Sequence, residues 1–164
     1  MKFNTLEEAT ELFRGVNGLG NDNCIFTIYK DPNVDAAQYA MFGAVGAAIS
    51  AGLAGGMQGG LEKEQALLVN QTESGLGIIP LKSKAQMVIN ISKMEPQLDR
   101  FVFIPNEKIE SVVIKNFNVF NKKLQKVQIQ INGMNLLREV GKVKDKDIEY
   151  QEANFARFMS RYKK

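Results

Sequence analysis

The sequence predicts a mainly β fold of the α+β class, in which antiparallel strands are followed by one C-terminal helix. Short β-branched and aromatic runs, separated by turn residues, follow one another from Ala66 to Val140. The C-terminal residues instead repeat apolar side chains at helical spacing, as does a short N-terminal stretch. A chain of 164 residues can bury a substantial core, so we expect one domain of ordinary size with an appendage.

The N-terminal stretch predicts a helix that begins with a capping box formed by Thr5 and Glu8. Gly15 is expected to end this helix, because glycine is favoured just past the last helical residue. The apolar face of the helix consists of Leu6, Ala9, Leu12 and Phe13. This face can pack either on the strands or on the glycine-rich segment described below.

A first strand is predicted over Cys24–Lys30, where the sequence CIFTIYK is β-branched and aromatic. Cys24 is the only cysteine of the chain, so the sequence offers neither an intramolecular disulfide nor a cluster of thiolate ligands. We expect Cys24 to be a small core residue, because free cysteine is among the most buried residue types.

Residues 36–60, AAQYAMFGAVGAAISAGLAGGMQGG, carry no charge and are rich in glycine and alanine. The glycines recur every three or four positions, so a helix formed here would have one nearly bare face. Such a face lets another helix approach closely, as small residues do in membranes. The glycines predicted to form this helix-packing or membrane face are Gly43, Gly46, Gly52, Gly55, Gly56 and Gly59.

Further strands are predicted after this segment. They are Ala66–Thr72, Gly75–Lys82, Met87–Ser92, Phe101–Pro105, Glu110–Lys115, Lys126–Ile131 and Met134–Val140. The clearest alternation lies in the sixth of them, where Val127, Ile129 and Ile131 are expected to point inward. Asn132-Gly133 then predicts a tight hairpin turn.

A C-terminal helix is predicted from about Asp147, with basic residues near its end, where the helix dipole favours cations. An aromatic stripe at helical spacing usually plugs a core, so we expect this helix to close one end of the strands. The apolar face consists of Ile148, Phe155, Phe158, Met159 and Tyr162.

The stretches ALLVNQTESGLGIIPLK, FVFIPNEKIESVVIKN and LQKVQIQINGMNLL, followed by the helix around YQEANFARFMSRY, resemble the pleckstrin-homology-like (PH-like) superfold. They are similar in particular to bacterial PH-like and GRAM-like domains, over roughly residues 64–162, with 24–30 as an additional strand. The resemblance implies a bent antiparallel barrel or sandwich plugged by the C-terminal helix. It also implies a scaffold that binds lipid or protein rather than an enzyme, although one superfold hosts unrelated functions.

The glycine-rich run departs from the simple family pattern and divides the chain into three parts. Residues 1–35 hold the N-terminal helix and first strand, and residues 36–60 form the Gly/Ala-rich apolar helical segment. Residues 61–164 are expected to form the domain that resembles the PH-like fold, with its C-terminal helix.

Sequence motifs of catalysis are absent. The chain has no histidine, which removes the commonest general base and metal ligand. Gly55 and Gly60 have the spacing of a phosphate-binding loop, but Leu61 stands where lysine is required. We therefore expect no enzymatic activity, no cofactor, no bound metal and no small-molecule substrate.

Two functional hypotheses follow from the glycine-rich run. In the first, the chain is a membrane-associated binding module in which residues 36–60 insert into or lie against a bilayer. In the second, it is a soluble self-associating adaptor, in which the same helix packs on the domain or on a second copy. The first is slightly favoured, because an exposed apolar run of this length needs a cover.

The C-terminal half of the chain, residues 82–164, carries a net positive charge, whereas the N-terminal half carries a net negative charge. Basic residues gather at one hairpin, KNFNVFNKKLQK, where an anionic ligand is expected to be lipid rather than nucleic acid. The predicted contact residues are Lys115, Lys122, Lys123 and Lys126. The N-terminus lacks the features of a signal peptide, so we expect an intracellular, cytoplasmic protein, with the inner face of the cell membrane as its site of association.

Overall fold

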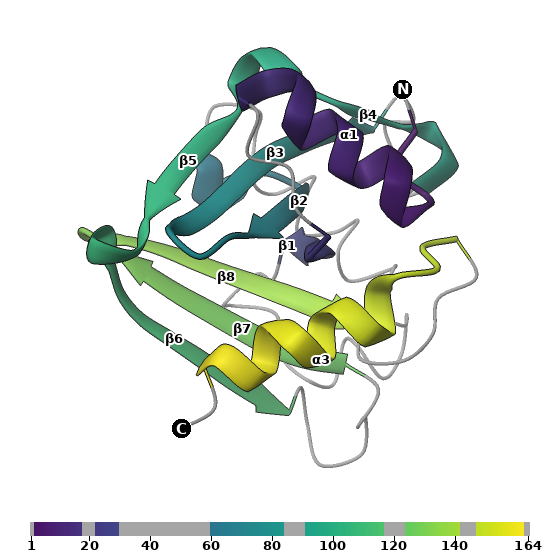
Figure 1. The fold of residues 1–164 in the computed structure, drawn as a ribbon. Coiled ribbons are helices and arrows are strands. Elements are labelled where there is room, and N and C mark those ends of the chain that lie inside the picture. Colours follow the sequence, from purple (N-terminus) through teal and green to yellow (C-terminus); the bar gives the residue numbers. More distant parts are fainter. Residues whose placement is uncertain are drawn as a thin grey trace.

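A computed structural model describes residues 2–17, 22–29, 60–83, 91–116, 124–141 and 147–162. These residues form a mainly β fold with two helices, which confirms the predicted α+β class (Figure 1). The helices are α1 (Leu6–Asn17) and α3 (Gln151–Tyr162). The strands are β1 (Cys24–Tyr29), β2 (Ala66–Gln71), β3 (Gly75–Ser83), β4 (Met94–Pro96), β5 (Val102–Pro105), β6 (Ile109–Asn116), β7 (Leu124–Ile131) and β8 (Met134–Gly141).

The eight strands form one antiparallel sheet in the order β4-β3-β2-β1-β8-β7-β6, and β5 also pairs with β3. The first strand of the chain therefore lies in the middle of the sheet, next to the last strand. The ladder between β1 and β8 is short and joins only Ile28 to Glu139 and Tyr29 to Arg138. The sheet is not closed, because β6 at one end does not pair with β4 or β5 at the other.

β4 and β5 lie one after the other along the outer edge of β3. On β3, Ile78 pairs with Val102 and Leu81 pairs with Pro96. The two positions on β3 are three residues apart, whereas their partners are six residues apart. The three additional residues form the turn η3 (Leu98–Arg100). This edge of the sheet is therefore interrupted by an extruded turn.

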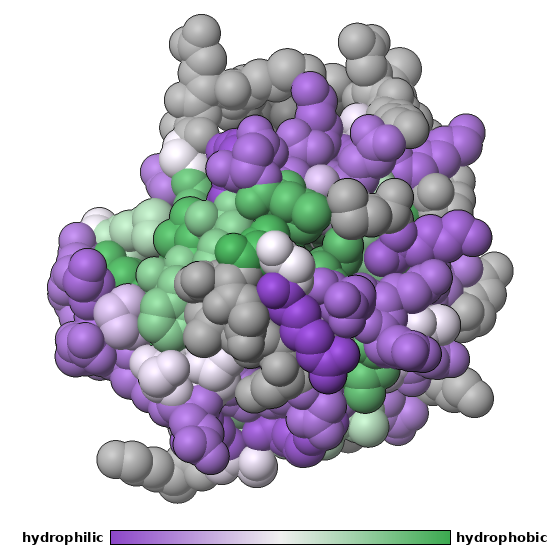
Figure 2. Space-filling view, turned by 45° about the horizontal axis from the view of Figure 1, so that its top comes forward, coloured by the Kyte–Doolittle hydropathy of each residue, from purple (hydrophilic) through white to green (hydrophobic). Residues whose placement is uncertain are grey.

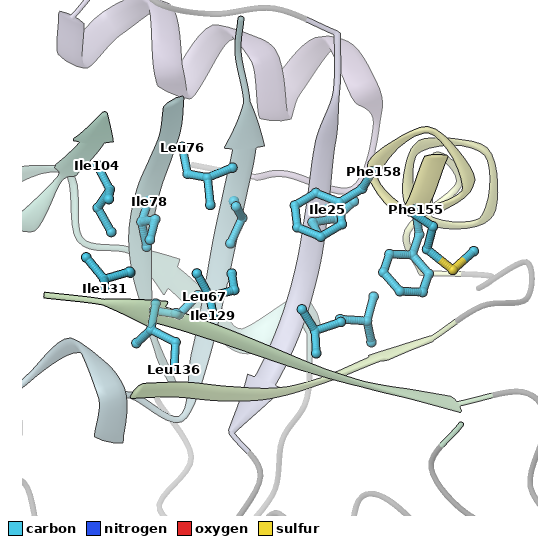
Figure 3. Packing of buried hydrophobic residues seen from close by; sticks show 14 residues of the cluster. Ile25, Leu67, Leu76, Ile78, Ile104, Ile129, Ile131, Leu136, Phe155 and Phe158 are labelled. Atoms are coloured by element: carbon cyan, nitrogen blue, oxygen red, sulfur yellow. The ribbon is translucent and has the colours of Figure 1, made fainter. Parts of the chain in front are cut away.

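The sheet divides into two half-sheets that face each other across a shared core. The first half-sheet contains β1 to β5, and the second contains β6, β7 and β8 (Figure 1). In Figure 3 the strands of the two half-sheets cross, and α3 closes one side of the space between them. We call this cluster the inner core; its labelled members are Ile25, Leu67, Leu76, Ile78, Ile104, Ile129, Ile131, Leu136, Phe155 and Phe158.

The opposite face of the first half-sheet is covered by α1 and forms an outer core. Ala9, Leu12 and Phe13 of the helix are buried there together with residues of β1, β2 and β3. The ring of Phe13 lies against Gly77, where a Cβ atom would come within 3.3 Å of the ring. The N-terminal helix therefore packs on the strands, which was one of the two positions that its sequence allowed.

α3 reaches the edge of β1 where β8 has diverged from it. The Gln151 side chain accepts the backbone N–H of Phe26 at 2.8 Å and donates to the carbonyl of the same residue at 2.8 Å. Asn154 donates to the carbonyls of Asp22 and Cys24, both at 2.9 Å. These two amides satisfy backbone groups that a neighbouring strand would otherwise satisfy.

Several sequence predictions are confirmed. Thr5 and Glu8 form the capping box, since the Thr5 Oγ1 accepts the N–H of Glu8 and the Glu8 carboxylate accepts the N–H of Thr5. Asn132 and Gly133 form the hairpin turn with positive φ angles of 40° and 84°. The inward residues of β7 and the aromatic face of α3 are buried, namely Val127, Ile129, Ile131, Phe155, Phe158 and Met159.

Four details of the prediction are wrong. α1 continues through Gly15 to Asn17, and α3 begins at Gln151 rather than near Asp147. Ile148 therefore precedes the helix, and it packs in the outer core instead of on the aromatic face of α3. The described end of the predicted strand 87–92 belongs to a 3-10 turn over Ile91–Lys93.

Candidate binding surfaces

The predicted site residues fall partly outside the described residues. All six glycines of the predicted bare face, from Gly43 to Gly59, lie there, as do Lys122 and Lys123. Lys115 on β6 and Lys126 on β7 are described. The structure therefore describes two parts of the predicted sites. One is the base of the glycine-rich segment, by which we mean the end of β1 and residues 60–66, and the other is the start and end of the basic hairpin.

The base of the glycine-rich segment is a regular part of the first half-sheet. Ile28 of β1 pairs with Ala66 of β2, and the N–H of Tyr29 donates to the carbonyl of Gln65 at 2.8 Å. Leu61, just after the segment, packs against the inner core. The chain thus leaves β1 and returns to β2 at neighbouring points of the sheet.

Arg138 of β8 holds this base together from the second half-sheet. Its side chain is 1% exposed, and its Nε donates to the Thr27 Oγ1 at 3.0 Å. Its Nη1 donates to the carbonyl of Glu64 at 2.7 Å, and its Nη2 donates to the carbonyl of Thr27 at 3.3 Å. One buried guanidinium therefore links β1, which precedes the glycine-rich segment, to Glu64, which follows it.

The side chain of Glu64 extends this connection to the surface. It forms an ion pair with Arg100 on the turn η3, which interrupts the β4–β5 edge. The same residue is thus held by Arg138 through its backbone and by Arg100 through its side chain.

Sequence reasoning missed the buried role of Arg138. The signal was the alternation of β8, where Leu136, Arg138 and Val140 occupy every second position and are all buried. The pairing of Val127 with Arg138 places both on the inner face. An arginine within an inward-facing series predicts a guanidinium with hydrogen-bond partners inside the fold.

The two described lysines of the basic hairpin are neighbours. Lys115 and Lys126 are directly paired between β6 and β7, and Lys126 is also paired with Glu139 of β8. They lie on the face of the second half-sheet that is turned away from the inner core, because Val127 and Ile129 point inward. Like charges placed opposite each other on adjacent strands repel, so the pair is suited to an anion.

The strands lead the chain into its two predicted contact regions in opposite directions. β1 runs antiparallel to β8 and leads into the glycine-rich segment, whereas β6 runs in the same direction as β8 and leads into the basic hairpin. The two features are therefore rooted at opposite ends of the strands. The glycine-rich segment and the basic hairpin therefore leave the sheet at separate places.

A shallow groove of about 380 Å³ lies between α1 and the turn η3. Its carboxylates are already engaged, since Glu8 caps α1 and Glu11 pairs with Arg14 at 3.3 Å. Figure 2 shows that hydrophobic residues gather on the side of the molecule where Figure 1 places β5. Val102 on β5 is 40% exposed there.

Two buried titratable groups have shifted pKa values. Burial raises the pKa of the Cys24 thiol from 9.0 to about 11, so the thiol is protonated at neutral pH. Burial also raises the pKa of Tyr150, whose hydroxyl donates to the carbonyl of Phe3 at 2.7 Å. Cys24 is fully buried, as predicted, and is not an activated nucleophile.

Two negative findings concern the described residues only. No three of their cysteine, aspartate and glutamate side chains come together as a metal site would require. Neither of the helices they form has the length and apolar character needed to cross a bilayer.

The chain was also compared with known proteins. No protein-family model, no curated protein and no solved structure matches it.

Proposed function

We propose that this chain is a non-catalytic binding module of the PH-like type that associates with anionic membrane surfaces. The strand order supports the PH-like assignment. The strands are antiparallel and form two facing half-sheets, and the helix that follows them closes the open side between the half-sheets. The stretches that carry the resemblance in sequence pattern contain β2, most of β3, β5, β6, β7, the first half of β8 and α3, but not β4.

The observation that carries the proposal is the position of the basic residues relative to the strand ends. Leu124 pairs with Gly141, and Gln125 pairs with Asn116, so two connections leave the second half-sheet side by side. One of them, residues 117–123, carries Lys122 and Lys123 in the sequence, and the other, residues 142–146, reads KVKDK. Lys115 and Lys126 pair at the root of the first connection.

Clustered lysines bind anionic lipid headgroups with about 1 kcal/mol each. The glycine-rich segment, which is rooted at the other end of the strands, makes a second contact with the membrane. Because the two roots lie apart, the electrostatic and the apolar contribution can be removed one at a time.

The first test is binding of the full chain to vesicles of neutral lipid with and without about one third phosphatidylserine. We expect the quadruple variant K115Q/K122Q/K123Q/K126Q to lose at least tenfold in affinity for the anionic vesicles. The matched control replaces four lysines elsewhere on the surface and should change the affinity less than twofold. Its positions are Lys2, Lys82, Lys93 and Lys108, all exposed. Equal losses in both variants would contradict a specific basic surface.

The second test separates membrane insertion from surface binding. After washing of membranes with alkaline carbonate, an inserted segment 36–60 keeps the chain in the pellet until detergent is added. Release by carbonate would exclude insertion of this segment. A chain that in addition does not bind anionic vesicles, but forms a defined oligomer in water, would favour the alternative, a soluble self-associating adaptor. The exposed apolar surface near β5 in Figure 2 is the observation that supports such a protein partner.

A further inference from the structure

The two edges of the sheet differ in how well they are protected against another strand. The β4–β5 edge is interrupted by the turn η3, and its two short strands end in Pro96 and Pro105. Short strands, proline and interruptions are the usual protection of a sheet edge. The other edge is β6, which is eight residues long and contains no proline.

β6 pairs with β7 on one side only among the described strands. Its irregularity is confined to the start, between Ile109 and Ser111, and the ladder from Ser111 to Asn116 is regular. The sequence of that stretch, SVVIKN, is strongly β-forming. Val113 in its centre is 38% exposed.

The charges of β6 favour an antiparallel partner of the same sequence. The strand has one acidic residue near its start, Glu110, and one basic residue near its end, Lys115. A parallel copy would place like charges together, whereas an antiparallel copy brings each Lys115 to the end that carries Glu110 of the other chain.

We propose that β6 is a self-complementary edge through which two copies of this chain pair antiparallel about Val113. In this register Val113 faces Val113 of the second copy, Val112 faces Ile114, and Ser111 faces Lys115. No like charges are opposed, and the two exposed Val113 side chains cover each other on the flank. The proposal stands independently of membrane binding.

The first experiment measures the mass of the full chain in solution, without lipid, by sedimentation equilibrium at several concentrations. We expect reversible association from the 18.3 kDa monomer to twice that mass. V113K places two lysines opposite each other and should shift the species to monomer. V102K is the comparison variant, because Val102 is similarly exposed but lies on β5, the competing apolar surface. If the copies pair through β6, V102K should leave the dimer intact.

The second experiment tests the register with engineered cysteines, since the native Cys24 is fully buried. Under mild oxidation V113C should form a disulfide-linked dimer with itself. S111C and K115C should each give much less alone, but cross-link when mixed. A wild-type monomer at every concentration would overturn the proposal, as would a dimer lost in V102K but kept in V113K. Equal self-linking of S111C and V113C would overturn the register.

Discussion

The two half-sheets share a core but differ in what covers their outer faces. In the first, β2 is buried at all six positions, because the inner core lies on one face and α1 lies on the other. In the second, β7 alternates between buried and half-buried residues, because only its inner face is covered by described elements. In the described residues, burial on both faces is therefore a property of the first half-sheet, and the outer face of the second is the one that carries Lys115 and Lys126.

The largest test of this comparison replaces the buried arginine that joins the two half-sheets. R138M removes the guanidinium that donates to the Thr27 hydroxyl and to the carbonyls of Thr27 and Glu64. Because these hydrogen bonds are made by a buried charged group, we expect a loss of about 3–5 kcal/mol in the free energy of unfolding. R100M removes the exposed ion pair to the same Glu64 and should cost less than about 1 kcal/mol. Urea denaturation of both variants measures the difference; similar losses would contradict a central role for Arg138.

A second test compares the outer faces directly. Leu68 is fully buried under α1, so L68A should cost about 3–5 kcal/mol. Leu137 is half-buried on the outer face of β8, and L137A should cost clearly less, about 1 kcal/mol. Equal costs in urea denaturation would mean that the outer face of the second half-sheet is covered as tightly as that of the first.

Glycine substitutions provide a smaller contrast. At Gly77 a new Cβ would approach the rings of Phe101 and Phe13 within 3.2 and 3.3 Å, so G77A should cost about 1–3 kcal/mol. At Gly141, on β8, a Cβ meets nothing within 4 Å, and G141A should be neutral or stabilising by about 0.5 kcal/mol. Thermal unfolding resolves the two signs, and a stabilising G77A would indicate that α1 packs loosely.

The last comparison concerns the pH dependence of stability and also belongs to the first half-sheet. The folded pKa of Cys24 lies above its ordinary value of 9.0, at about 11. The protonated thiol therefore stabilises the fold fully below pH 9, and this contribution is lost as the pH rises towards 11. We expect stability to fall more steeply between pH 9 and 11 in the wild type than in C24S, measured by urea midpoints. Parallel curves would contradict the assigned shift.

Local patterns in the sequence predicted most of the strands and both helices. The alternation of Val127, Ile129 and Ile131 identified the inner face of β7, and Thr5 with Glu8 identified the start of α1. These features depend only on residues near one another in the chain.

The remaining features depend on pairing between distant parts of the chain. The register between strands is not specified by any local period in the sequence. It determines the position of α1, the interruption of the β4–β5 edge and the amide contacts of Gln151 with Phe26. The burial of Arg138 is the intermediate case, because its own strand alternates but its partners, such as Thr27, are far away in the sequence. For the candidate site, the sequence indicated that lysines gather in one hairpin, whereas the pairing of Lys115 with Lys126 follows from the register of β6 and β7.

The neighbours of β1 have a consequence for the time course of folding. β1 is made early, because it lies near the start of the sequence. The backbone groups on one of its sides are paired by β8 and by the side-chain amides of Gln151 and Asn154 in α3, which are made much later. During synthesis β1 can join the β2–β3 hairpin early, but its other side stays unpaired until β8 and α3 have been synthesised. Such long-range contacts slow folding and prolong the exposure of apolar strands. Shortening the chain before Gln151 should therefore yield a species that aggregates, even though all eight strands are present.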